Sequence, residues 1–243
     1  AGYPSLNDTE MILGYLEDNG VDLVEVGMPY SDPMADGPVI QESSQKALAN
    51  GMNLQLLFEQ ITRARTHVEL PIVLMGYYNQ VLQFGVERFA SEAAKAGVDG
   101  LILPDLPVEE YVEIVEPIFS KQGLTHSFLI TPSTTDERIK KLDEASSGFL
   151  YAVSSHSITG GKASSNLSDY GKRLNALQLK NPVQVGFGIK DEDSFKAATD
   201  IADGGIIGSA FIRALSAGGN LETNISSFIK SIRSQALDQK ELA

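Results

Sequence analysis

Short apolar runs alternate along the chain with longer segments in which apolar residues recur three and four positions apart. The short runs have the length of buried strands, and the longer segments have the period of a helix that packs on one face. We expect seven strands, at residues 23–26, 72–75, 100–103, 127–130, 149–153, 183–185 and 205–207. We expect helices at residues 5–19, 39–49, 54–66, 81–96, 108–121, 136–145, 167–177, 191–202 and 221–237.

This alternation predicts an α/β fold, because strands separated by helices pair in parallel through right-handed crossovers. Gly20, Gly51, Gly97 and Gly123 stand where helices are expected to end, as glycine stop signals do. No linker or low-complexity tract divides the sequence. We therefore expect one domain over residues 1–243.

The number of strands bears on the type of sheet. A closed (β/α)8 barrel needs eight strands, and the first predicted helix is preceded only by Ala-Gly-Tyr-Pro, which looks like the turn after a strand. The expected fold is a TIM barrel, N-terminally truncated, that lacks strand one in this chain. The alternative is a seven-stranded open sheet with its ligand at a switch point. The barrel is favoured because candidate functional residues follow the carboxyl ends of strands along the whole chain.

Glu25 is a carboxylate in the middle of the first apolar run. Side chains alternate along a strand, so Glu25 points away from the face that carries Val24 and Val26. The valines suit the helix layer, which directs Glu25 inward. An apolar interior raises the pKa of a carboxyl group and lets it act as an acid and then as a base. The alternative is a partner for a buried cation, but no predicted strand interior contains Arg or Lys.

Asp36 follows this strand within the string Ser-Asp-Pro-Met-Ala-Asp-Gly-Pro. Taken alone, the string is typical of a turn in which Asp bonds to its own backbone. The loop nevertheless lies directly above Glu25, and active sites of barrels are built on such loops. Position therefore makes Asp36 a second catalytic candidate.

Three glycine-containing segments predict a phosphate site. They are Ser-Ile-Thr-Gly-Gly-Lys at 157–162, Val-Gly-Phe-Gly-Ile at 185–189 and Ile-Ile-Gly-Ser-Ala-Phe-Ile at 206–212. Glycines let backbone N–H groups approach an oxyanion, and we expect a short helix that begins at Ser209 to add its dipole. Each segment alone is compatible with a tight turn. Together, at adjacent strand ends, they indicate that the substrate carries a phosphate.

Composition narrows the partners and the chemistry. The 19 basic and 32 acidic residues give a net charge of −13, which argues against nucleic acid or a membrane surface as a partner. The absence of cysteine excludes disulfides and thiol chemistry. His67, His126 and His156 lack the spacing of zinc ligands, so we expect no metal. Strand interiors without lysine argue against a Schiff-base aldolase.

The sequence resembles the tryptophan synthase alpha subunit family. The resemblance is carried by Glu-Val-Gly-Met-Pro-Tyr-Ser-Asp-Pro-Met-Ala-Asp-Gly-Pro-Val-Ile-Gln at 25–41, Pro-Asp-Leu-Pro-Val-Glu-Glu at 104–110, Thr-Gly-Gly at 159–161, Gly-Phe-Gly-Ile at 186–189 and Gly-Ser-Ala at 208–210. These motifs occur in the order of the family. The likeness covers the chain except for a missing N-terminal segment.

The resemblance implies a lyase that cleaves indole-3-glycerol phosphate to indole and glyceraldehyde 3-phosphate without a cofactor. It implies that Glu25 is the proton shuttle and that Asp36 binds the indole N–H and stabilises positive charge on the ring. The implied phosphate contacts are Gly160, Gly188, Gly208 and Ser209. The implied indole pocket contains Met75, Tyr77, Ile102, Ile130, Tyr151 and Phe187, and the implied loop residue that meets Asp36 on closure is Thr159.

The same resemblance implies a partner, the pyridoxal phosphate-dependent beta subunit, in an alpha2beta2 heterotetramer. The implied contact residues are Asp32, Pro33, Asn79, Pro104 and Asp105. The implied location is the cytoplasm, or a plastid if the source is a plant.

The sequence departs from the family at two positions and leaves three alternative functions open. Ser155 stands where arginine is common and Ser157 where glycine is usual, so we expect altered loop closure. A standalone lyase and a catalytically weak allosteric partner of the beta subunit are alternative functions. A sugar phosphate epimerase is disfavoured, because such barrels bring metal-binding histidines.

Overall fold

Every strand pairing among the described residues is parallel. The computed structural model describes residues 1–33, 36–153, 163–186 and 188–233. Strands pair in the order β1-β2-β3-β4 and β5-β6-β7-β8. Their bounds are β1 (Val24–Gly27), β2 (Ile72–Met75), β3 (Gly100–Ile102), β4 (Thr125–His126), β5 (Phe128–Ile130), β6 (Leu150–Val153), β7 (Val183–Gly186) and β8 (Gly204–Ile206). The seven predicted strands are thus confirmed to within about two residues, with one of them divided.

The divided strand is the one predicted at 127–130. Ser127 separates β4 from β5, yet its N–H still donates to the carbonyl of Leu101 at 3.0 Å, and its hydroxyl accepts from the N–H of Phe149 at 3.0 Å. Ser127 therefore links the two halves of the sheet. The eight strand segments occupy seven positions of a barrel, and no pairing among the described residues joins β1 to β8.

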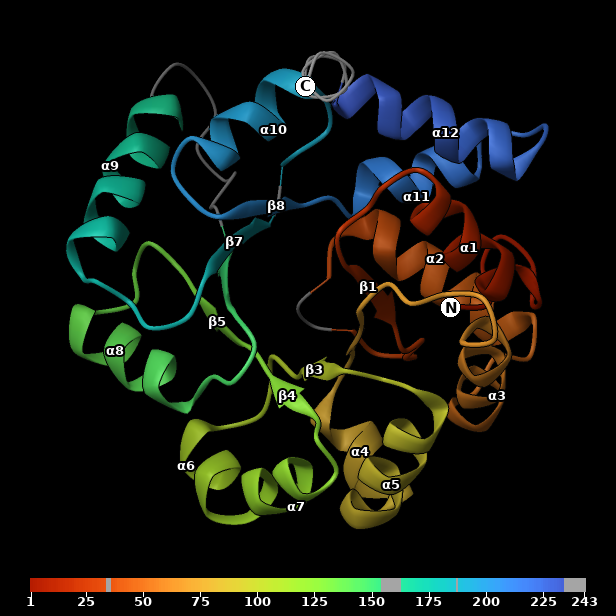
Figure 1. Ribbon diagram of the computed structural model, residues 1–243, viewed down its shortest axis with the longest axis horizontal. Coiled ribbons are helices and arrows are strands. Elements are labelled where there is room, and N and C mark those ends of the chain that lie inside the picture. The colour runs from red at the N-terminus through yellow and green to blue at the C-terminus, as the bar shows by residue number, and fades with distance from the viewer. Residues whose placement is uncertain (34–35, 154–162, 187, 234–243) are drawn as a thin grey trace.

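Helices surround the strands as a ring (Figure 1). They are α1 (Asp8–Asp18), α2 (Pro38–Ala49), α3 (Leu54–Ala64), α4 (Tyr78–Phe84), α5 (Val86–Ala96), α6 (Val108–Glu110), the π-helix η1 (Tyr111–Val115), α7 (Glu116–Lys121), α8 (Asp136–Ala145), α9 (Ala163–Ala176), α10 (Glu192–Thr199), α11 (Ser209–Leu215) and α12 (Leu221–Ile232). They cover the outer face of the sheet only. This excludes the doubly wound open sheet, which carries helices on both faces.

Two predicted helices differ in detail. The helix expected at 81–96 is divided into α4 and α5 at Gly85, whose φ of 91° is a conformation that glycine adopts at little cost. The helix expected at 108–121 runs through α6, η1 and α7. Such π-helical turns are inserted within α-helical stretches and are not visible in hydrophobic periodicity.

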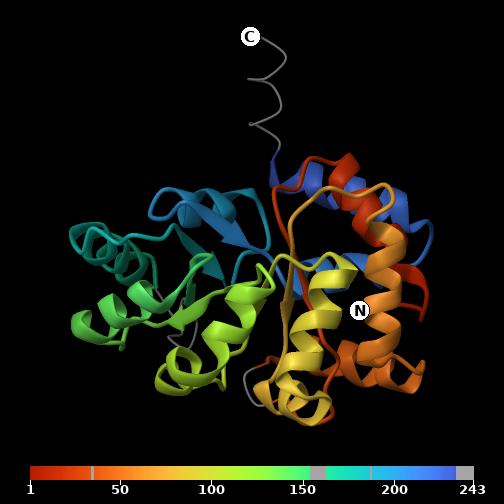
Figure 2. The same cartoon turned by 60° about the horizontal axis from the view of Figure 1, so that its bottom comes forward.

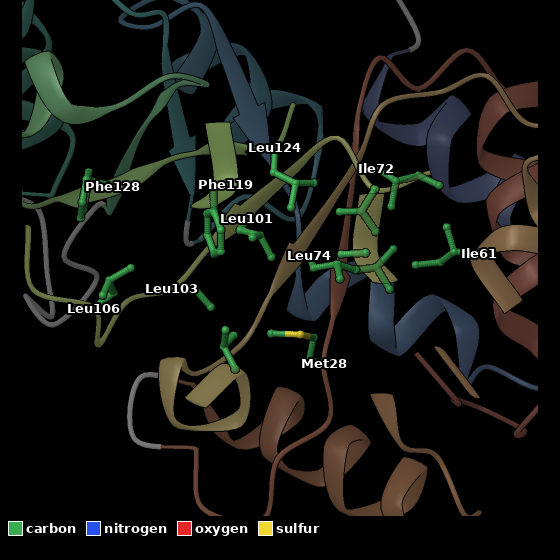
Figure 3. Packing of buried hydrophobic residues seen from close by; sticks show 14 of the residues in the cluster. Met28, Ile61, Ile72, Leu74, Leu101, Leu103, Leu106, Phe119, Leu124 and Phe128 are labelled. Carbon is green, nitrogen blue, oxygen red and sulfur yellow. The ribbon is translucent and has the colours of Figure 1, made fainter. Parts of the chain in front are cut away.

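The core has two parts, because successive strand residues face opposite sides of the sheet. Ile72, Leu74 and Leu101 belong to the large cluster between strands and helices, part of which Figure 3 shows. Val73 and Ile102 belong to a smaller cluster inside the barrel. In the parallel register, Glu25 lies beside Val73 and therefore faces the interior.

The two ends of the described chain pack side by side. Helix α1 (red) lies against α12 (blue), as Figures 1 and 2 show, and α2 (orange) lies against α11 (blue), as Figure 1 shows. The ring is therefore completed by helix packing next to β1 and β8. Within the described residues, no helix combines the length and apolar character that crossing a bilayer would need.

Candidate active site

A cavity of about 880 Å³ opens between β1 and β8. It extends from the loops after the strands toward α1 and α12, where Leu16 and Ile232 line it. The predicted site residues that line it are Glu25, Pro33, Asp36, Met75, Tyr77, Pro104, Tyr151, Gly188, Gly208 and Ser209. Residues from six regions of the sequence thus converge on one hollow.

Glu25 presents an unpaired carboxyl group to this cavity. As a whole the residue is half-buried, but its Oε2 atom is fully buried and has no hydrogen-bond partner among the described residues. Burial, and secondarily the negative charge of Asp36, raise the pKa of Glu25 from 4.5 to about 7. None of the ion pairs in the described part of the chain includes Glu25. A carboxyl group that titrates near neutrality can both donate and accept a proton.

Asp36 is held at the end of the loop that leads from β1 into α2. Its Oδ2 accepts a hydrogen bond from the hydroxyl of Tyr77 at 3.0 Å, and its backbone carbonyl accepts from Nε2 of Gln41 at 2.8 Å. Burial raises the pKa of Asp36, and the bond from Tyr77 opposes that rise. The charge of Asp36 acts on Glu25, so the two carboxyl groups share one electrostatic environment.

Tyr151, on β6, is close to both carboxyl groups and to Gly186 of β7. Burial and the charges of Glu25 and Asp36 raise its pKa well above 10, so the phenol stays neutral. A Cβ atom on Gly186 would come within 2.2 Å of its hydroxyl oxygen. Gly186 therefore makes room for the tyrosine. The sequence interpretation placed Gly186 in the segment at 185–189 predicted to approach a phosphate and did not connect it with Tyr151, although glycine inside a strand is a known sign of close approach.

Of the other predicted pocket residues, Met75 packs with the inner cluster and lines the cavity. Ile102 is buried in the same cluster but does not line the cavity. Ile130 requires a correction, because it packs in the outer cluster beneath the helices. Its neighbour Leu129 takes the interior position. Adjacent residues of a strand cannot both face inward, and in β5 the interior side falls to Leu129.

Gly188, Gly208 and Ser209 lie together on the β7 and β8 side of the cavity. Gly188 has a φ of 80°, and Ser209 is the first residue of α11, as expected. Thr159, Gly160 and Phe187 lie outside the described residues, and so do Ser155 and Ser157. No group of three or more histidine and acidic side chains in the described ranges is arranged to hold a metal ion.

The residues predicted to contact a partner occupy loops that are linked to one another. Asn79 donates from Nδ2 to the hydroxyl of Tyr30 at 2.9 Å, and the N–H of Tyr78 donates to Oδ1 of Asp105 at 2.7 Å. Asp32 is exposed. The loops after β1, β2 and β3 therefore form one connected surface at the mouth of the cavity, and Tyr30 lies in the first of these loops.

The sequence of the chain was compared with protein families and with known proteins. The family profile described as "Tryptophan synthase alpha chain" matches residues 1–240. The tryptophan synthase alpha chain of Christiangramia forsetii is 52% identical over 235 residues, which are 96% of this chain and 91% of that protein. The chain of the same name from Flavobacterium johnsoniae is also 52% identical over 235 residues, with 96% and 92% covered.

Solved structures agree with the fold. The alpha subunit of Legionella pneumophila str. Paris superposes with a TM-score of 0.88 at 35% identity, covering 98% of this chain and 90% of that one. A chain from the tryptophan synthase a2b2 complex of Pyrococcus furiosus gives a TM-score of 0.85 at 35% identity, with 96% and 95% covered. The predicted TIM barrel is confirmed, and the chain belongs to the tryptophan synthase alpha chain family.

Proposed function

We propose that this chain cleaves indole-3-glycerol phosphate by a retro-aldol reaction into indole and glyceraldehyde 3-phosphate. The observation that carries the proposal is the unpaired, buried carboxyl oxygen of Glu25 in the cavity that also contains Asp36. A reaction that protonates a carbon and deprotonates a hydroxyl can use one group for both steps when that group titrates near neutrality. The raised pKa of Glu25, about 7, suits it to both steps.

Glu25 is protonated at the start of the reaction. Its proton goes to the indole carbon that bears the glycerol chain, and the positive charge that results is delocalised onto the ring nitrogen. Asp36 accepts a hydrogen bond from the indole N–H and stabilises that charge. The Glu25 carboxylate then takes the proton of the glycerol hydroxyl next to the scissile bond. The carbon–carbon bond breaks, its electrons return to the ring, and an aldehyde forms.

Substrate placement follows from the remaining residues of the cavity. We assign the phosphate to Gly188, Gly208 and Ser209, which line the cavity near the start of α11, and the indole ring to the side of Met75 and Tyr151. By family resemblance, the assignment adds Thr159, Gly160 and Phe187. Anchoring the phosphate away from the reacting atoms would hold the substrate in a geometry suited to proton transfer.

We further propose that the chain assembles with a pyridoxal phosphate-dependent beta subunit in an alpha2beta2 complex. The relative from Pyrococcus furiosus is described as part of an a2b2 complex. The surface proposed for the contact is the linked set of loops after β1, β2 and β3. Its residues are Asp32, Pro33, Asn79, Pro104 and Asp105.

The test is release of indole from indole-3-glycerol phosphate by the purified chain, alone and with a beta subunit. The Glu25→Gln variant should lose turnover by roughly a thousandfold or more, because it removes the group that moves both protons. Glu87→Gln is the matched control, since Glu87 is exposed on α5. Indole release at the wild-type rate by the Glu25→Gln variant would overturn the mechanism.

Comparing activity with and without the beta subunit separates the three functional candidates. A subunit of the complex gains activity when the partner is added. A standalone lyase turns over at the same rate without it. A catalytically weak allosteric partner leaves indole release near background in both cases but changes the rate of the beta subunit.

A further inference from the structure

Asp36 owes its orientation to a residue in the loop between β2 and α4. The hydroxyl of Tyr77, the residue that precedes α4, donates to its Oδ2 at 3.0 Å. The negative charge of Asp36 raises the pKa values of two neighbouring groups, the carboxyl of Glu25 and the phenol of Tyr151. Neither carries a positive charge at neutral pH. Within the described residues, Tyr77 is thus the one side chain that donates a hydrogen bond to the carboxylate of Asp36.

The backbone of Tyr77 is itself fixed. Its N–H donates to Oε1 of Gln80 at 3.2 Å, and Nε2 of the same glutamine donates to the carbonyl of Pro29 at 3.0 Å. Gln80 therefore joins the start of α4 to the loop after β1. This places the tyrosine hydroxyl at a defined position relative to the loop that carries Asp36.

A second aromatic ring packs against Tyr77. The centroid of the Tyr30 ring lies 5.1 Å from that of Tyr77, with 31° between the ring planes. The hydroxyl of Tyr30 accepts a hydrogen bond from Nδ2 of Asn79 at 2.9 Å, and its N–H donates to the hydroxyl of Ser44 at 2.9 Å. We call Asn79, Tyr30 and Tyr77 the tyrosine brace. It runs from an exposed side chain to the carboxylate in the cavity.

We propose that Tyr77 is a positioning residue that holds Asp36 toward the substrate, and that Asn79 acts on Asp36 through the ring of Tyr30. The inference rests on the proposed function and deepens it. Without the bond from Tyr77, the carboxylate is free to rotate away from the indole N–H, and burial alone determines its protonation. Because Asn79 is exposed at the proposed partner surface, a contact there reaches the active site without a large movement.

The first experiment compares two adjacent tyrosines. Tyr77→Phe keeps the ring contact and removes only the hydroxyl. Tyr78→Phe is the matched control, because the hydroxyl of Tyr78 bonds to Glu110 and not to Asp36. We expect Tyr77→Phe to lower kcat roughly tenfold or more, as for loss of a hydrogen bond to a charged group, with a smaller change in KM. The Tyr78→Phe variant should keep the wild-type values.

A carboxyl carbon NMR titration of Asp36 tests the same point without substrate. We expect its titration midpoint to move to higher pH in Tyr77→Phe and to stay in place in Tyr78→Phe. An unchanged midpoint in Tyr77→Phe would overturn the positioning role, even if the enzyme were active. If the wild-type chain released no indole, the proposed function would fail, whereas the titration would still decide the role of Tyr77.

The second experiment is a double-mutant cycle between Asn79→Ala and Tyr77→Phe. Asn79→Ala alone should reduce kcat by a few fold, since it loosens Tyr30 but leaves the Tyr77 hydroxyl in place. In the Tyr77→Phe background the same change should have little further effect. Independent, multiplicative effects of the two substitutions would show that Asn79 does not act through the brace.

Discussion

The hydroxyl of Tyr151 occupies space that any side chain on Gly186 would need, since a Cβ atom there would lie 2.2 Å from it. The two residues belong to neighbouring strands, β6 and β7, and Tyr151 faces the carboxyl groups of the site. The absence of a side chain at one position therefore permits the ring at the other. This relation decides where one wall of the cavity stands.

Gly186→Ala should displace the ring of Tyr151 into the cavity and lower kcat/KM for indole-3-glycerol phosphate by roughly tenfold or more. The double variant Gly186→Ala, Tyr151→Leu removes the clash, so the alanine should cost much less in that background than in the wild type. Steady-state kinetics of the four proteins check this. Equal losses in both backgrounds would mean that Tyr151 is not the residue displaced.

Ionisation of the buried Glu25 should lower the stability of the folded chain as the pH rises. Its pKa is about 7 in the folded chain, against 4.5 as the ordinary value, so between these values the folded state binds more protons. The contribution of Glu25 to the free energy of unfolding is therefore fully present below pH 4.5 and is lost as the pH rises through 7. Its size is about 3 kcal/mol. Urea unfolding at pH 8 should accordingly show Glu25→Gln to be more stable than the wild type.

Burial of His126 should make the folded chain less stable as the pH falls. It is fully buried between Tyr111 and Phe128, with ring centroids 4.6 and 4.5 Å away, and neither ring nitrogen has a hydrogen-bond partner among the described residues. Burial lowers its pKa from 6.5 to about 3. Because only the unfolded chain takes up the proton between these values, stability falls by about 1.4 kcal/mol for each pH unit below 6.5.

The two effects oppose each other between pH 4.5 and 6.5, so the wild type should show a nearly flat stability there. Glu25→Gln should expose the histidine slope, with stability rising as the pH rises. His126→Phe should expose the glutamate slope, with stability falling as the pH rises. Chemical unfolding across this window measures both, and parallel profiles for the two variants would contradict the assignment.

Ile130 and Leu129 provide a test of which face of β5 borders the interior. Ile130→Ala should lower the free energy of unfolding by about 2–4 kcal/mol, because it opens a cavity beneath the helices. It should leave KM for the substrate unchanged. An increase in KM without loss of stability would place Ile130 on the interior after all.

Much of the site could be predicted because few polar residues interrupt the apolar runs, and each one that does is a candidate for a role in the site. Glu25 identifies the inner face of its own strand, since a carboxyl group is tolerated there only beside a cavity or a partner. In the run from Ser127 to Ile130 no such marker exists. A strand buried on both faces reads as continuously apolar, so the sequence does not indicate which side of it faces inward.

The sequence by itself determined the order of strands and helices, the inward direction of Glu25 and the family, because these depend on local periodicity and on contiguous motifs. Only the tertiary structure decided the contact of Tyr30 with Tyr77 and the fit of Tyr151 over Gly186. Those relations join residues that are 47 and 35 positions apart. Their distances are set by the curvature of the sheet and the packing of its loops, which no local pattern encodes.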